Sequence, residues 1–243
     1  MDNSFIRSVK VEATDTSVYP FSIPAVKKID SVQLSNPVTF FVGENGSGKS
    51  TIVEAIAVAA GFNAEGGTKN YNFSSADTTS SLKDAITLIR GYRREKYGYF
   101  LRAESFYTTA NYADSGTALG PILFDGKRIH EQSHGEAFMS IVGTFRPGLF
   151  IFDEPESALS PQRQLALILA IDQLIKEGSQ FIIATHSPIL LAYPKATIYQ
   201  LSEDGIEKVR YQATDHYRIT RDFLNDPSYY LGEMFNTEEP TDP

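Results

Sequence analysis

The sequence predicts an α/β domain whose core is a mostly parallel β-sheet. Three mostly apolar runs, Val38–Val42, Leu149–Phe152 and Gln180–Ala184, have the composition of strands that are buried on both faces. Segments of helical composition lie between them, at Thr51–Ala60 and Pro161–Lys176. Because strands that alternate with helices are usually joined by parallel crossovers, we expect helices on both faces of the sheet.

The residues before the first apolar run predict an N-terminal antiparallel β lobe. Ser4–Val11 and Tyr19–Ile23 have the composition of short strands, broken by polar turn residues and prolines. Ser81–Ile89 predicts a helix, and Tyr97–Arg102 predicts a further strand. Near the C-terminus, Asp204-Gly205 is typical of a hairpin turn between two strands.

Composition and length limit the class of protein. The 243 residues, of which 42% are hydrophobic, suit one domain, which we expect over residues 1–236 with a disordered acidic tail at 237–243. The absence of cysteine excludes disulfides and thiolate chemistry. No run approaches the roughly 20 apolar residues of a membrane helix, so we expect a cytoplasmic protein without membrane insertion. The net charge of −8 disfavours indiscriminate binding to nucleic acid, although a local basic groove is compatible with it.

A phosphate-binding loop follows the first apolar run directly. Residues 43–50 match GxxxxGKS between a predicted strand and a predicted helix, which is the context that the motif requires. Glycines let backbone N–H groups turn toward phosphate oxygens, and the helix behind them adds the positive end of its dipole. Lys49 is expected to reach the β- and γ-phosphates of ATP, and the Ser50 hydroxyl to ligate Mg²⁺. The candidate nucleotide-binding residues are Gly43, Glu44, Asn45, Gly46, Ser47, Gly48, Lys49, Ser50 and Thr51.

Polar residues also follow the other two apolar runs. Asp153 and Glu154 end the second run, and carboxylates at the C-terminal edge of a parallel strand face the ligand crevice. Asp153 is a candidate Mg²⁺ ligand, and Glu154 a candidate base that activates the attacking water. His186 follows the third run and is a candidate hydrogen-bond donor to the γ-phosphate. Together with Lys49, these side chains predict ATP hydrolysis.

With these motifs the chain resembles the ABC-type ATPases, and within them the small stand-alone predicted ATPases of the SMC/RecF-like branch. The segments that carry the resemblance are similar to the Walker A motif at 43–51, Walker B at 153–155, the D-loop at 157–160 and the H-loop at 185–187. Residues 132–136, Gln-Ser-His-Gly-Glu, lie where that family has its Leu-Ser-Gly-Gly-Gln signature, 20 residues ahead of Walker B at Ser133. Ser133 and Gly135 match the signature, whereas His134 and Glu136 depart from it, as Ser160 departs from the usual Asp of the D-loop.

The resemblance implies an ABC-type head with a reduced helical lobe that works as a head-to-tail homodimer. Ser133 and Gly135 of one chain would then contact the γ-phosphate of ATP held by the other chain. Glu104, after the strand at Tyr97–Arg102, stands where the family has its Q-loop glutamine and is a candidate Mg²⁺ ligand. Tyr19 or Phe21 could stack on the adenine, although core packing is the favoured interpretation of both.

A zinc protease is an alternative interpretation of one segment. His130, Glu131 and His134 match HExxH, and Glu154 stands 20 residues further on as a third ligand. The pattern requires both histidines on one face of a stable helix, whereas Gly135 follows directly and apolar periodicity is lacking. The helix is expected to begin at Gly135 instead.

Several processes remain open for an ATPase of this kind. Only about 80 residues separate the phosphate loop from Ser133 without any heptad pattern, which excludes the long coiled-coil arm of SMC-like relatives. Coupling to the maintenance of DNA or RNA, to a separate nuclease chain or to a bacterial defence effector is expected. The first alternative is a regulatory nucleotide switch with little turnover. A transporter energising subunit ranks below it.

Overall fold

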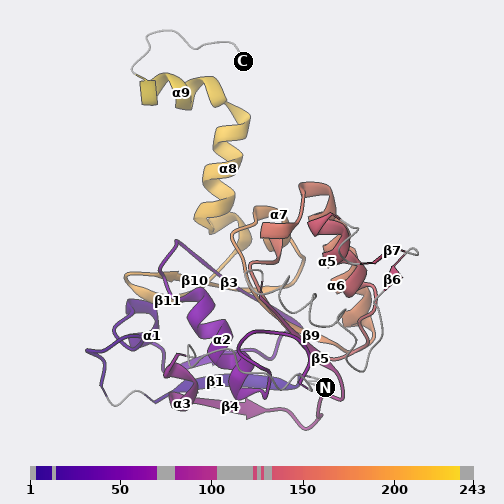
Figure 1. Cartoon of the computed structure of the whole chain (residues 1–243). Coiled ribbons are helices and arrows are strands. Elements are labelled where there is room, and N and C mark those ends of the chain that lie inside the picture. Colours follow the sequence, from indigo (N-terminus) through magenta and orange to yellow (C-terminus); the bar gives the residue numbers. More distant parts are fainter. Residues whose placement is uncertain are drawn as a thin grey trace.

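The computed structural model describes residues 4–12, 15–69, 80–102 and 133–235, together with two short strands between the last two ranges (Figure 1). Its strands are β1 (Ile6–Val11), β2 (Ser31–Gln33), β3 (Val38–Gly43), β4 (Ile86–Arg90), β5 (Gly98–Arg102), β6 (Leu123–Phe124), β7 (Lys127–Arg128), β8 (Leu149–Asp153), β9 (Gln180–Ala184), β10 (Thr197–Ser202) and β11 (Gly205–Val209). Its α-helices are α1 (Pro24–Lys27), α2 (Lys49–Ala59), α3 (Leu82–Ala85), α5 (His134–Val142), α6 (Pro161–Lys176), α7 (Pro188–Leu191), α8 (Asp215–Asn225) and α9 (Pro227–Phe235), and 3₁₀ turns lie at Pro155–Ala158 and Tyr211–Ala213.

The predicted parallel sheet is confirmed. Six strands follow the order β11-β10-β3-β9-β8-β5, and every neighbouring pair is parallel except the β10–β11 hairpin. The register aligns Phe41 with Ala184 and Ala184 with Asp153, so β3, β9 and β8 end at one edge. The loops that leave this edge therefore meet in space.

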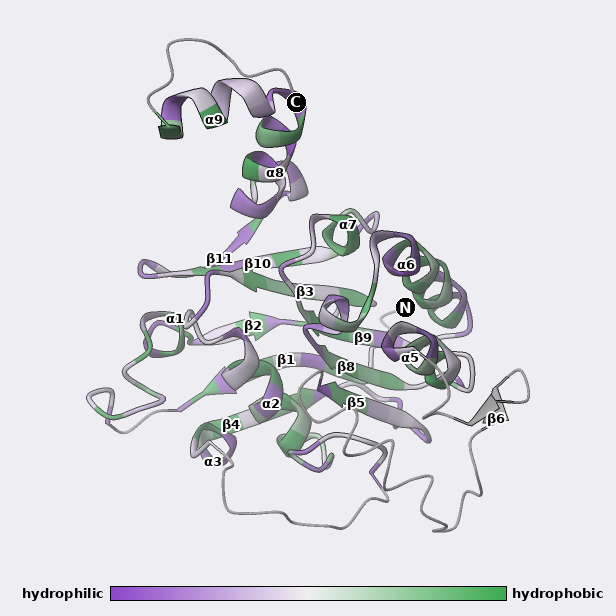
Figure 2. Ribbon diagram, turned by 45° about the horizontal axis from the view of Figure 1, so that its top comes forward, coloured by the Kyte–Doolittle hydropathy of each residue, from purple (hydrophilic) through white to green (hydrophobic). Residues whose placement is uncertain are grey.

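The two faces of the sheet carry two separate apolar layers. On one face, Phe41, Ile151 and Ile182 pack with α2 and the N-terminal lobe. On the other face, Phe150 and Phe181 stack at 4.7 Å between ring centroids beneath α5 and α6. Figure 2 shows the resulting apolar central strands between helices on either side. Burial on both faces explains why these strands read as unbroken apolar runs.

The N-terminal β lobe is antiparallel, as predicted, but two of its elements differ from expectation. The predicted helix at Ser81–Ile89 ends at Ala85, and β4 follows and pairs with β1, because Ile86 and Leu88 alternate toward the core of the lobe. The predicted strand at Tyr19–Ile23 is wrong. The chain turns there and enters α1 at Pro24, whose fixed φ suits the first position of a helix.

The C-terminal hairpin predicted around Asp204-Gly205 is confirmed, and α8 and α9, which follow it, project from the body as an arm (Figure 1). Neither helix has a buried residue. Several large apolar side chains of the arm are exposed: Ile219, Phe223, Leu224, Tyr229, Met234 and Phe235. None of the helices in the described ranges has the length and hydrophobicity that crossing a bilayer requires. The expected tail at 237–243 lies outside the described residues.

The side chain of Gln180 joins the lobe to the parallel sheet. Gln180, the first residue of β9, is 1% exposed, and its Oε1 accepts hydrogen bonds from the N–H groups of Phe5 and Ile6 at 2.8 and 2.9 Å. Its Nε2 donates to the carbonyl oxygens of Ile6 and Leu34 at 2.8 and 2.6 Å. The side chain thus fills both its donor and its acceptor capacity inside the core.

Gln180→Leu is expected to lower the free energy of unfolding by about 3 kcal/mol, because it removes these four bonds and leaves buried backbone groups unpaired. Urea denaturation followed by circular dichroism measures the change. The matched control is Gln173→Leu on the exposed side of α6, which should alter stability by less than about 0.5 kcal/mol. Equal effects of the two substitutions would contradict this account of the lobe.

Candidate functional site

The phosphate loop lies between β3 and α2, where the motif predicted it. Gly43 has a φ of +155°, and a Cβ at this position would lie 2.5 Å from the carbonyl oxygen of Leu201. Gly48 has a φ of +99° and is the residue from which α2 starts. Side chains are therefore excluded at both ends of the loop by strain or by contact, which leaves a backbone cradle at the helix N-terminus.

Lys49 is held inside this cradle. It is 4% exposed, and its Nζ donates to the carbonyl oxygens of Gly43 at 2.9 Å and Glu44 at 3.1 Å. Burial lowers the pKa of Lys49, and the carboxylates of Glu154 and Asp153 oppose that shift. A phosphate oxygen placed here would add a negative charge beside a partly desolvated ammonium group, where the interaction is strong.

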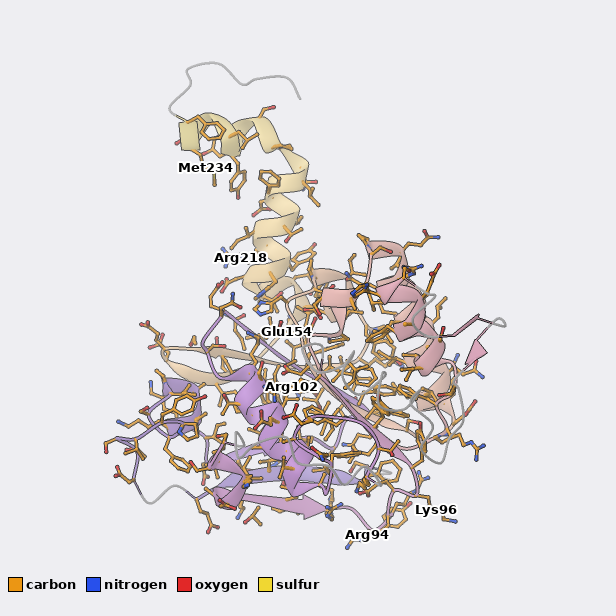
Figure 3. The ribbon with its side chains drawn as sticks, in the orientation of Figure 1. Arg94, Lys96, Arg102, Glu154, Arg218 and Met234 are labelled. Carbon is orange, nitrogen blue, oxygen red and sulfur yellow. The ribbon has the colours of Figure 1, made fainter. Side chains whose placement is uncertain are left out.

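The two acids of the second apolar run occupy different environments. Asp153 ends β8 and is buried, whereas Glu154 is partly exposed and adopts a left-handed backbone conformation, with φ +50°. The N–H of Glu154 donates to Ala184 at 2.9 Å, which holds this turn against β9. The turn brings the Glu154 carboxylate within 3.4 Å of His186 Nε2, in the region where Figure 3 labels Glu154.

Glu156 joins the site although the sequence did not single it out. Its Oε1 accepts a hydrogen bond from the backbone N–H of His186 at 2.5 Å, so the D-loop segment is tied to the H-loop. Burial raises the pKa of Glu156, with the nearby charge of Glu154 acting in the same direction. Gln164 links the same two segments. Its Oε1 accepts a hydrogen bond from Ser187 Oγ at 2.5 Å, and its Nε2 donates to the carbonyl oxygen of Leu159 at 3.0 Å.

His216 is a second residue that sequence reasoning missed. It belongs to the first turn of α8, and its Nε2 lies 2.9 Å from His186 Nδ1. Burial lowers the pKa of His216, and the proximity of His186 adds to that shift. No motif surrounds His216, and 30 residues separate it from His186, so only the packing of α8 on the sheet reveals the pair.

A cavity of about 390 Å³ opens beside the phosphate loop and reaches the base of α8. Its lining comprises Pro24, Gly43, Glu44, Asn45, Gly46, Ser47, Gln200, Leu201, Ser202, Glu203, Asp215 and His216. Neither Tyr19 nor Phe21 belongs to this lining. Tyr19 is 69% exposed, while Phe21 packs partly buried against the core of the N-terminal lobe.

Two of the residues proposed for Mg²⁺, Ser50 and Asp153, are placed by α2 and β8. Ser50 and Thr51 are the second and third residues of α2, which packs against β8. Asp153 is the last residue of β8. A hydroxyl on a helix N-terminus and a buried strand-end carboxylate are oxygen donors of the kind that Mg²⁺ prefers, with phosphates and water completing its coordination. Glu104 lies outside the described residues. The strand before it is anchored by a 2.8 Å ion pair between Arg102 and Glu54 (Figure 3).

The candidate signature segment forms the start of α5. Ser133 is the N-cap with an extended backbone, and Glu136 completes a capping box, its carboxylate accepting from the Ser133 N–H at 2.8 Å. Glu136 therefore occupies a position where glutamine would serve equally well. A Cβ on Gly135 would lie 2.9 Å from the carbonyl oxygen of Ala158, so this glycine sets the approach of α5 to the D-loop.

The same capping geometry disfavours the zinc alternative. His130 and Glu131 lie outside the described residues, but Ser133 has a φ of −64° and a ψ of 156°, which interrupts any helix running from His130 to His134. In the described part of the chain, no group of three or more His, Asp or Glu residues is placed to hold a metal ion. Glu154 faces His186 rather than serving such a group.

Comparisons with known proteins agree with this geometry. A family model described as "AAA domain" matches residues 22–134, and one described as "AAA domain, putative AbiEii toxin, Type IV TA system" matches residues 137–192. The phosphate import ATP-binding protein PstB 1 of Streptococcus agalactiae is 26% identical over 176 residues, which cover 62% of this chain and 70% of that protein.

Solved structures share the fold at low sequence identity. CbiO1 from Clostridium perfringens, part of the ABC transporter complex CbiONQ, matches with a TM-score of 0.54 at 15% identity, over 96% of this chain and 99% of that one. MJ1267, an ATP-binding cassette of an ABC transporter in its ADP conformation, matches with a TM-score of 0.51 at 17% identity, over 97% and 99%.

The parallel sheet, the phosphate loop and the AAA-domain matches define a P-loop nucleotide-binding protein. Within that class, its AAA-domain matches, its fold and its curated relative are consistent with an ABC-type P-loop ATPase.

Gly135→Ala is expected to destabilise the protein by about 1–3 kcal/mol, because the added methyl group meets the Ala158 carbonyl oxygen and forces α5 away from the D-loop. Thermal unfolding measures the loss. The control is Gly143→Ala at the other end of α5, where φ is −62° and the site is exposed; that change should be neutral or slightly stabilising. A fully stable Gly135→Ala variant would show that α5 and the D-loop are not closely packed.

Proposed function

We propose that the chain hydrolyses ATP as a nucleotide-gated head-to-tail homodimer. The observation that carries this proposal is the convergence of Lys49, Glu154 and His186 at one edge of the sheet, with two of the side chains 3.4 Å apart. Closure on ATP and opening after hydrolysis would be a population shift driven by a ligand that bridges two chains.

The residues divide the work of hydrolysis by their environments. Lys49, held over the loop backbone, would bind the β- and γ-phosphates and balance charge as it develops on them. Glu154, partly exposed, is accessible to water and would accept its proton as the water attacks. His186 lies beside Glu154 and would donate a hydrogen bond to the γ-phosphate.

Ser50 and Asp153 would hold Mg²⁺ in this proposal, with Glu104 as a further ligand. The metal would neutralise charge on the β- and γ-phosphate oxygens. The fit is supported by the buried position of Asp153 at the strand end and by the start of α2 beside it.

The dimer is supported by two features of the described residues. Ser133 and Gly135 lie at the N-terminus of α5, where N–H groups and the helix dipole favour an anion such as a phosphate from a second chain. The exposed apolar side chains of α8 and α9 form a surface that soluble chains normally cover with a partner.

The process that hydrolysis drives is proposed to involve a separate effector. The description of the model matching residues 137–192, a putative toxin of a toxin–antitoxin system, favours a defence or toxin partner chain over DNA or RNA maintenance. A regulatory switch with little turnover uses the same site. The similarity to a phosphate import ATP-binding protein supports a transporter energising subunit as the second candidate.

Glu154→Gln is expected to reduce turnover of ATP at least about 100-fold while leaving ATP binding intact, because the amide cannot accept the proton of the attacking water. The variant should accumulate as a dimer in the presence of ATP and Mg²⁺. Phosphate release and light scattering on a sizing column measure the two effects. The matched control is Glu177→Gln at the exposed end of α6. Normal turnover in Glu154→Gln, or a monomer with ATP, would refute the mechanism.

Turnover in the presence of DNA or RNA separates the partner hypotheses. The effector interpretation predicts that wild-type ATPase activity changes less than about twofold, because the net charge of −8 opposes binding to a phosphate backbone. Strong stimulation that weakens as salt rises would instead establish a nucleic-acid partner.

A further inference from the structure

The imidazoles of His186 and His216 form a hydrogen-bonded pair between the H-loop and the base of α8. The Nδ1 of His186 and the Nε2 of His216 are 2.9 Å apart, and the ring centroids are 5.1 Å apart. The other nitrogen of His186, Nε2, lies 3.4 Å from Glu154 Oε1. His186 is therefore contacted on one side by α8 and on the other by the candidate catalytic base.

This arrangement specifies which nitrogen of His186 carries hydrogen. A bare lone pair on Nε2 would face the Glu154 carboxylate and repel it, so Nε2 is the protonated position. When His186 is neutral, Nδ1 must then accept a hydrogen bond, which the Nε2–H of His216 donates. When His186 is charged, Nδ1–H donates to His216 instead. In both cases Nε2 keeps its hydrogen on the side of Glu154.

His216 is itself held firmly in place. Thr214 is buried and caps α8. Its hydroxyl accepts a hydrogen bond from the backbone N–H of Tyr217 at 3.3 Å and donates one to the carbonyl oxygen of Tyr211 at 2.8 Å. Asp215 accepts a hydrogen bond from Gln200 of β10 at 3.1 Å. The first turn of α8, which carries His216, is thus closed by the Thr214 cap and joined to β10 through Asp215.

We propose that His216 is a positioning residue that orients His186 and keeps its Nε2–H directed at the γ-phosphate of ATP. The proposal rests on the ATPase function proposed above. It assigns a role to a residue of α8, outside every motif of the phosphate site, and it makes the base of the projecting arm part of the nucleotide site. A displacement of α8 would then alter the hydrogen bond that His186 offers to the nucleotide.

The first test compares two substitutions of His216. His216→Leu removes the hydrogen bond at similar volume and is expected to lower kcat about 10-fold or more, with KM for ATP changed less than about threefold, because a partner that orients a site residue typically carries an effect of this size. His216→Gln retains an amide that donates or accepts and should recover most of kcat. Asn225→Leu on the exposed end of α8 is the control. An unchanged kcat in His216→Leu, or equal losses in Leu and Gln, would overturn the proposal.

A double mutant tests whether His216 acts through His186. His186→Ala combined with His216→Leu should be no slower than His186→Ala alone, because the second substitution then removes a contact that no longer exists. Losses that multiply would mean that His216 acts independently of His186.

A readout without ATP separates this proposal from the proposed function. NMR of the imidazole nitrogens should find His186 protonated at Nε2 in the wild-type protein and in His216→Gln, but a mixture of tautomers in His216→Leu. A His186 tautomer that is the same in all three proteins would overturn the role of His216 even in an active ATPase. Conversely, the expected NMR pattern in a protein without turnover would refute only the ATPase function.

Discussion

The burial of the central strands on both faces is the constraint on which the rest of the structure depends. Because β3, β9 and β8 pack against helices on either side, their residues are mostly apolar, and the polar residues of the candidate site lie at or just after the strand ends. Their parallel register then brings Gly43, Asp153 and His186 to the same edge. The site is a consequence of how the sheet is covered.

One lysine lies among the acids at that edge. Lys49 lies near the carboxylates of Asp153, Glu154 and Glu156. Burial lowers the pKa of Lys49, and the negative charges of these carboxylates oppose that shift. The Glu156 carboxylate differs from the other two, because burial raises its pKa and the backbone N–H of His186 binds it. Its hydrogen bond places the H-loop relative to the D-loop. In the proposed mechanism, three neighbouring acids would thus serve metal binding, proton acceptance and loop positioning because their environments differ.

The errors of the sequence prediction fall where pairing overrides local preference. Residues 81–89 have helical composition, yet Ile86 begins a strand because β1 offers an unpaired edge and the core of the lobe accepts Ile86 and Leu88. The turn at 19–23 read as a strand because Tyr, Phe and Ile favour strands, while the prolines that interrupt backbone pairing decided its conformation. Both segments lie away from the parallel sheet, in which long apolar runs leave less choice.

The sequence by itself determined the phosphate loop, the acids after β8 and the parallel sheet that carries them, since each depends on residues adjacent in the chain. The glycines, Lys49 and the Asp153-Glu154 pair can be recognised in the sequence because the strand, turn and helix that carry them are local structures. Only the tertiary structure decided that Gln180 joins the lobe to the sheet and that His216 orients His186. These contacts span 174 and 30 residues, and no local pattern records which distant backbone a side chain will meet once the core has closed.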